Sequence, residues 1–119
     1  MIKISRLIKS FSYAWRGLFK TFREEQNLRI QIVVAIAVIG VGLFFKISRI
    51  EWCVVILSIS LVVLMEIANS AVERITDVLK PRLDHYVKEI KDIMAAAVMV
   101  ASIAAAIIGI VIFYPHLFK

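Results

Sequence analysis

Three long apolar runs limit what this chain can fold into more than any other feature of its sequence. They cover Ile30–Phe45, Trp52–Ala71 and Ile93–Phe113, with few polar residues inside them. Each is close to, or above, the roughly 20 residues that cross about 30 Å of hydrocarbon as a helix. We therefore predict an all-α membrane protein with transmembrane helices at about residues 29–47, 51–76 and 90–114.

Composition and charge agree with a membrane location. Apolar residues make up 61% of the 119 residues, compared with about 45–50% in soluble domains. The length fits one domain over residues 1–119. Lys and Arg gather before the first run and between the second and third runs, which predicts a cytoplasmic N-terminus and an external C-terminus. The net charge of +6 then reflects topology and attraction to anionic lipids, not binding to nucleic acid.

The segment before the first apolar run has the pattern of an amphipathic helix. Residues 2–22 place apolar side chains at helical spacing, and basic residues occupy much of the remaining surface. Such a helix is suited to the cytoplasmic membrane interface. We predict a surface helix and its connection over residues 1–28, and short loops at residues 46–51 and about 78–89. Pro81 is expected to end the second membrane helix. His85 and His116 each lack a partner at metal-ligand spacing.

Four polar residues form a stripe on the second predicted membrane helix. Glu66, Asn69, Glu73 and Asp77 follow one another at spacings of three, four and four, so they fall within an arc of about 80°. A carboxylate near the bilayer centre costs roughly 2.5–3.5 kcal/mol on insertion scales. Two explanations fit: a hydrogen-bonded packing face between helices, or a reaction site where the membrane meets water.

Acidic and basic residues gather near the predicted cytoplasmic face. Carboxylates are the ligands that Mg²⁺ prefers, usually one or two per ion, with substrate phosphates and water completing the shell. Basic side chains on the same side suit phosphate groups, and the combination fits phosphoryl transfer. The acids are Glu24, Glu25, Glu73, Asp77, Asp84, Glu89 and Asp92, and the bases are Arg6, Lys88 and Lys91.

Glu66 differs from these acids because it lies about two turns deeper than Glu73. At that depth it is a candidate general base for a hydroxyl presented from the lipid side, and a lipid alcohol is such a substrate. Asn69, one turn nearer to water, is placed to orient that hydroxyl or to hold the Glu66 side chain.

The same residues resemble the prokaryotic diacylglycerol kinase family, which includes undecaprenol kinases. The resemblance lies in Glu66–Asp77, in Lys91-Asp92 with the alanine-rich run after it, and in Tyr13–Leu18 and Glu24–Arg29. It implies a small kinase of the bacterial cytoplasmic (inner) membrane, a homotrimer with three spans and one surface helix per subunit. It also implies transfer of the γ-phosphoryl group of MgATP to the hydroxyl of a membrane lipid.

The resemblance also implies roles for single residues. Glu66 matches the proposed general base, and Glu25 and Glu73 match the metal-binding acids. The positions that match nucleotide-binding residues are Arg6, Tyr13, Glu25, Glu73, Asp77, Lys91 and Asp92. Those that match substrate-positioning residues are Glu66, Asn69 and Ala95. The Gly or Ser that the family often has just after the Lys-Asp pair is Ala in this chain, at Ala95 or Ala96.

Two questions concern the second loop and the acceptor. Pro81–Asp84 departs from the Pro-Glu-Tyr-His often found in the family, which weakens any nucleotide contact assigned to this loop.

Glu24–Ile30 and Ile50–Trp52 look more like the undecaprenol kinases, so undecaprenol is favoured as acceptor and diacylglycerol comes next. The alternatives are a proton-coupled transporter that uses Glu66 and a membrane scaffold without catalysis.

Overall fold

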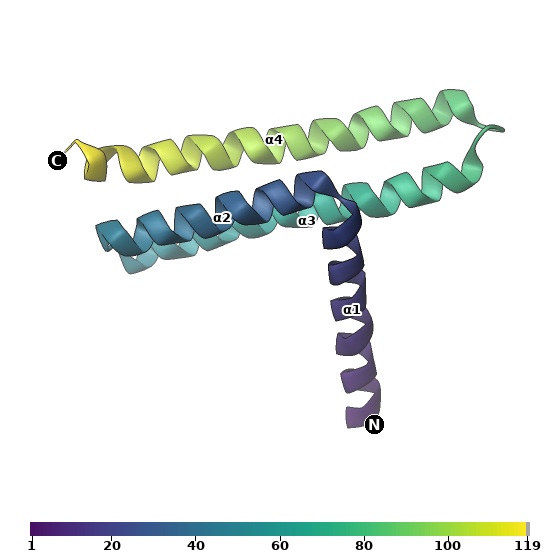
Figure 1. The fold of residues 1–119 in the computed structure, drawn as a ribbon, viewed down its shortest axis with the longest axis horizontal. Helices are drawn as coiled ribbons and strands as arrows, with labels where there is room; N and C mark the ends of the chain where they lie inside the picture. Colours follow the sequence, from purple (N-terminus) through teal and green to yellow (C-terminus); the bar gives the residue numbers. More distant parts are fainter. Residues whose placement is uncertain (119) are drawn as a thin grey trace.

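The computed structural model describes residues 1–118, and these residues form four helices. They are α1 (Ile4–Glu24), α2 (Gln26–Phe45), α3 (Arg49–Leu79) and α4 (Asp84–Leu117). Helices α2, α3 and α4 lie side by side, and α1 leaves them at a steep angle (Figure 1). The predicted all-helical fold, with three long apolar helices, is confirmed.

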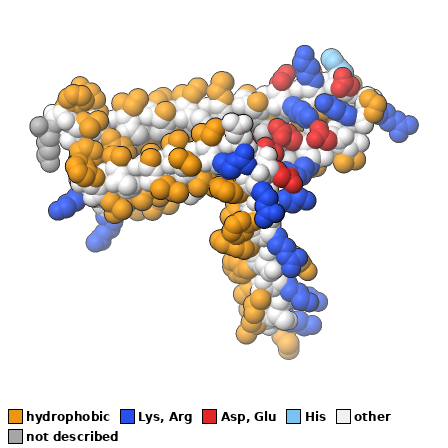
Figure 2. Space-filling model, in the orientation of Figure 1, with side chains coloured by type: hydrophobic (Ala, Val, Ile, Leu, Met, Phe, Trp, Pro, Cys, Tyr) orange, Lys and Arg blue, Asp and Glu red, His pale blue; other side chains and the backbone are white. Residues whose placement is uncertain are grey.

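The three helices α2, α3 and α4 are long enough and apolar enough to cross a membrane. Hydrophobic side chains cover most of their length, whereas charged side chains gather near the junction with α1 and over the α3–α4 turn (Figure 2). We call this charged region the α1 end of the bundle and the opposite region the Lys46 end. On α1 itself, hydrophobic side chains lie along one side and basic side chains along the other (Figure 2).

The connections are shorter than the sequence predicted. Helix α3 ends at Leu79 and α4 begins at Asp84, so the expected loop at about residues 78–89 contracts to four residues around Pro81. Residues 84–92 contain neither Gly nor Pro, so no strong helix breaker prevents α4 from starting before the apolar run. Lys91 and Asp92 therefore lie well inside α4 and not at its start.

The chain changes direction at Glu25, between α1 and α2. Glu25 has an extended backbone (φ −107°, ψ 111°), and its N–H donates to the carbonyl of Thr21. The guanidinium of Arg29 donates to the carbonyls of Phe22 (3.2 Å) and Arg23 (2.6 Å). These bonds satisfy carbonyls that the end of α1 leaves free, and Leu28 behind them is fully buried. The bend thus fixes the backbone that carries the predicted metal ligand Glu25.

The Lys46 end is closed by a helix cap and a small apolar cluster. The Ser48 hydroxyl accepts from the Glu51 N–H, and the Glu51 carboxylate accepts from the Ser48 N–H, which is a capping box at the start of α3. Ile47, Val55 and Ile112 are buried beside it. This cluster joins the ends of all three long helices.

His116 has a partner that its sequence position did not reveal. Its Nε2 lies 3.3 Å from the Glu51 Oε2, and its ring lies against that of Phe45. The sequence could not show this contact, because the partner is 65 residues away and only the antiparallel packing of α3 and α4 joins the two residues. The contact adds a polar link between these helices.

Gly42 permits a close contact between α2 and α3. A Cβ at this position would lie 2.9 Å from Cη2 of Trp52 and 3.2 Å from Cδ1 of Ile47, whereas a Cβ at Gly40 would meet nothing within 4 Å. We predict that Gly42→Val destabilises the fold by roughly 1–3 kcal/mol, because the Trp52 ring must move. Thermal unfolding in one detergent should show a lowered midpoint for Gly42→Val and a parental midpoint for Gly40→Val. Equal midpoints for the two variants would contradict this assignment.

Candidate active site

Glu66 is the buried acid at the centre of the candidate site. It lies on α3, and only 1% of its surface is exposed. Its Oε2 accepts a hydrogen bond from Nε2 of Gln31 at 3.4 Å, while its Oε1 is buried without a hydrogen-bond partner among residues 1–118. Buried polar atoms are normally satisfied. An unpartnered carboxylate oxygen therefore leaves capacity to accept one more hydrogen bond, such as one from a hydroxyl.

Gln31 is the site residue that the sequence interpretation missed. It is one of the few polar residues inside the apolar runs and received no role there, but the structure brings it from α2 against Glu66 on α3. The available signal was the isolation of a single amide in an otherwise apolar segment, because such a group needs a partner within the membrane.

Asn69 and Glu73 form the next level of the site toward the α1 end. The Asn69 amide donates to Oε1 of Glu73 at 3.3 Å, and both side chains are partly buried. Asn69 was expected to orient the hydroxyl or to hold Glu66. In the structure it holds Glu73 instead, one turn further along α3. Gln31 takes the role next to Glu66, since it faces that carboxylate from another helix.

The carboxylates of Glu25 and Glu73 suit a divalent cation whose other ligands are water and phosphate. Glu25 lies at the bend between α1 and α2, and Glu73 lies on α3 seven residues after Glu66. Within residues 1–118, no three His, Cys, Asp or Glu side chains gather closely enough to hold a metal by themselves. A Mg²⁺ ion commonly takes one or two carboxylates and completes its shell with water and nucleotide phosphates. The two acids fit that type of site.

Asp77 and Lys91 continue the polar stripe as an ion pair between α3 and α4. The Lys91 ammonium lies 2.9 Å from Oδ1 of Asp77. Asp77 lies about 16 Å along α3 from Glu66, near the end of α3 at Leu79. Asp92 and Ala95 are exposed on α4, so this chain alone does not turn them toward Glu66.

Arg6 and Tyr13 lie furthest from the other predicted site residues. Only the C-terminal part of α1 packs against the bundle, where Thr21 is its buried residue. At 1.5 Å per residue, Arg6 lies about 27 Å along α1 from Glu24, and Tyr13 about 16 Å. Within one chain, the structure does not bring these two side chains to Glu66.

An ion pair ties the end of α1 to the stripe-bearing helix. The Arg74 guanidinium on α3 bonds to the carboxylate of Glu24 and also donates to the carbonyl of Ser70. Exposed pairs of this kind add little stability. The pair nevertheless links the residue just before Glu25 to the residue just after Glu73, so it helps to hold the two predicted metal ligands on one side of the molecule.

Comparison with known proteins identifies the family. The model of the prokaryotic diacylglycerol kinase family matches residues 12–113. This chain belongs to that family. It is 35% identical to the undecaprenol kinase of Bacillus subtilis over 97% of this chain and 94% of the relative. It is also 29% identical to the diacylglycerol kinase of Escherichia coli K12, over 94% and 92% of the two chains. The diacylglycerol kinase of Synechocystis is 35% identical over 93% of this chain and 64% of that longer protein.

Family membership decides among the three functions that the sequence left open. The chain is a multi-pass membrane protein and a lipid kinase, not a proton-coupled transporter or a scaffold without catalysis. The resemblance of the sequence motifs to the prokaryotic diacylglycerol kinase family is thereby confirmed.

Proposed function

We propose that this lipid kinase transfers the γ-phosphoryl group of MgATP to the hydroxyl of undecaprenol, with Glu66 as general base. The observation that carries the proposal is the buried Glu66 carboxylate, which has one oxygen held by Gln31 and the other without a partner in residues 1–118. A substrate hydroxyl that donates to this oxygen satisfies it.

The reaction needs one proton transfer and one phosphoryl transfer. As the hydroxyl oxygen forms its bond to the γ-phosphorus, its proton passes to Glu66, and the bond from the γ-phosphorus to the bridging oxygen of ADP breaks. The Gln31 amide keeps the carboxylate in place during this step. Because the Glu66 side chain is already held in place, it loses little conformational entropy when the substrate binds.

Glu25 and Glu73 would hold the Mg²⁺ that accompanies ATP. When bound, this ion neutralises charge on the phosphates as the phosphoryl group moves. Glu73 lies about 10 Å along α3 from Glu66, and Asn69 fixes its carboxylate. Arg6, Tyr13, Asp77, Lys91 and Asp92 remain our candidates for nucleotide contacts, and Ala95 remains a candidate for lipid positioning.

Undecaprenol is the proposed acceptor, and diacylglycerol is the next candidate. The Bacillus subtilis relative is an undecaprenol kinase, and this chain aligns with it over almost its full length. The diacylglycerol kinase of Escherichia coli is less similar, at 29% identity, and that of Synechocystis, at 35% identity, is matched over only 64% of its length. Both acceptors present a hydroxyl at the headgroup level, so Glu66 suits either of them, and the tail must carry the selection.

We further propose a homotrimer in the bacterial inner membrane, with α1 on the cytoplasmic surface and the C-terminus outside. The placement of Lys and Arg supports this orientation. Family membership and the many apolar side chains left exposed on α2, α3 and α4 support association in the membrane. In a trimer, α1 of one subunit would be available to the site of another, which would bring Arg6 and Tyr13 to a nucleotide.

The decisive experiment is a direct acceptor assay. The purified chain in lipid bilayers is incubated with γ-labelled ATP and Mg²⁺, separately with undecaprenol, diacylglycerol and a glycerol control. We expect labelled undecaprenyl phosphate as the main product and no label transfer without Mg²⁺. Preferential phosphorylation of diacylglycerol would overturn the acceptor, and an absence of any lipid product would overturn the function.

A further inference from the structure

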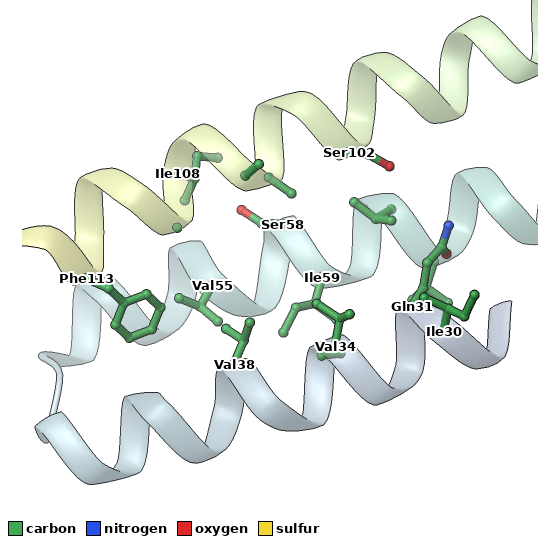
Figure 3. Close-up of a pocket in the computed structure, with 16 residues that line it drawn as sticks. Ile30, Gln31, Val34, Val38, Val55, Ser58, Ile59, Ser102, Ile108 and Phe113 are labelled. Atoms are coloured by element: carbon green, nitrogen blue, oxygen red, sulfur yellow. The ribbon is translucent and has the colours of Figure 1, made fainter. Parts of the chain in front are cut away.

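An apolar groove runs between the three membrane helices and ends at Gln31. It has a volume of about 310 Å³, and its walls come from α2, α3 and α4. Along it, Gln31 lies at one end and Phe113 at the other, with Val38, Val55 and Ile108 between them (Figure 3). Because Gln31 also donates to Glu66, the groove adjoins the proposed general base.

The floor of the groove lies on the same face of α3 as Glu66. Ile59, Val62 and Val63 line the groove, and they precede Glu66 by seven, four and three residues. These are the spacings that place side chains on one face of a helix. The apolar floor therefore continues directly into the polar stripe, with the buried carboxylate where the two meet.

We infer that this groove holds the first part of a single hydrocarbon tail, that of a polyprenol, while its hydroxyl reaches Glu66. The inference rests on the proposed function, and it names the part of the molecule that selects the acceptor. The tail enters from the bilayer and lies along α3 toward the Lys46 end. The groove then determines how much of the tail the protein grips.

The size and lining of the groove fit one chain better than two. Its volume of about 310 Å³ is roughly twice the 150 Å³ of a protein cavity that takes up benzene. From Val63 to Val55 it extends about 12 Å along α3. One branched chain fills such a space, whereas diacylglycerol would have to leave its second chain outside.

Polar groups in the groove are too few to suit an ester-linked lipid. The hydroxyl of Ser58 already donates to the carbonyl of Val54 at 2.8 Å. Ser102 supplies the other hydroxyl and Gln31 the amide at the end (Figure 3). Ester carbonyls near the headgroup would compete for Gln31, which Glu66 uses. A tail without polar atoms leaves that bond to Glu66 intact.

Two glycines give a matched test. Gly109 lines the groove near its Phe113 end, and a Cβ there would meet nothing within 4 Å. Leucine at this position should therefore occupy groove space without a clash. Gly40 is also open to an added side chain but does not line the groove, so Gly40→Leu is the control. If Gly109→Leu does not fold, Ala105→Leu, one turn closer to Gln31, replaces it.

The measurement is the kcat/KM of each purified variant in bilayers for a long and a short alcohol. The long one is undecaprenol, and the short one is dimethylallyl alcohol, which does not reach Gly109. We expect Gly109→Leu to lower kcat/KM for undecaprenol roughly tenfold, as for small volume changes in a hydrophobic pocket. Its values for the short alcohol and its KM for ATP should stay within about twofold of the parent, a range well below that effect. Gly40→Leu should match the parent throughout.

Several outcomes would overturn the inference. Unchanged use of undecaprenol by an active Gly109→Leu variant would show that the tail lies elsewhere. An equal loss for both alcohols, with a changed oligomer size, would show that a second copy of the chain fills the groove. Preference of the parent for diacylglycerol would contradict the claim that the groove selects a lipid with a single tail. A parent inactive on every alcohol would instead overturn the proposed function itself, and this inference with it.

Discussion

Glu66→Gln is expected to lower kcat by roughly 10²–10⁴-fold, the contribution typical of a positioned general base. Glutamine has nearly the same shape and keeps a hydrogen-bonding partner for Gln31, but it cannot take the proton of the substrate hydroxyl. The KM for ATP should change little, because Glu66 does not contact the nucleotide in the proposed mechanism. Steady-state kinetics with undecaprenol in bilayers would measure both values.

A folding control is needed, since Glu66 is almost completely buried. The thermal midpoint and oligomer size of Glu66→Gln in detergent should equal those of the parent, because the change removes a buried charge and not packing. Glu66→Asp should keep the charge but fall short of the hydroxyl, so it should also be slow. A folded Glu66→Gln enzyme with more than about a tenth of the parental kcat would rule out the general-base role, given the size of that effect.

Glu25→Gln and Glu73→Gln should each lower the rate by at least about 10²-fold at a fixed, low Mg²⁺ concentration. Both changes remove a hard oxygen ligand while keeping the size of the side chain. The metal lowers the free energy of the charged transition state of phosphoryl transfer by several kcal/mol. Raising the Mg²⁺ concentration should recover part of the lost rate, because the phosphates of ATP still bind the ion. The measurement is the rate as a function of Mg²⁺ at saturating ATP.

The control for these variants is Glu89→Gln. Glu89 is an exposed acid of α4, and we assign it no part in the site, so its variant should keep the parental Mg²⁺ dependence. Variants at Glu25 and Glu73 that are slow but show the same Mg²⁺ dependence as the parent would contradict their role as metal ligands. A role in packing alone would instead lower the thermal midpoint.

The fold was predictable because each membrane helix carries its own signal. Long apolar runs such as Ile93–Phe113 must form helices in a bilayer, where every backbone group needs an internal partner. The helix ends were less predictable. Helix α4 begins at Asp84, several residues before the predicted start at residue 90, because the apolar pattern marks where the chain enters the hydrocarbon and not where hydrogen bonding begins.

The candidate site was predictable where its residues share one helix. The spacing of Glu66, Asn69 and Glu73 already placed them on one face of α3, and the family resemblance assigned their roles. Contacts between helices were not predictable from spacing. Gln31 beside Glu66, and Glu51 beside His116, each join residues far apart in the sequence.

By itself, the sequence determined the three membrane helices, the polar stripe and membership of a lipid kinase family, because periodicity and motif spacing are local properties of the chain. Only the tertiary structure decided which amide holds Glu66, which acid Asn69 holds, and where an apolar groove opens next to them. The physical reason is that a pattern on one helix fixes which side chains share a face. The opposite wall of a site depends on how the helices pack.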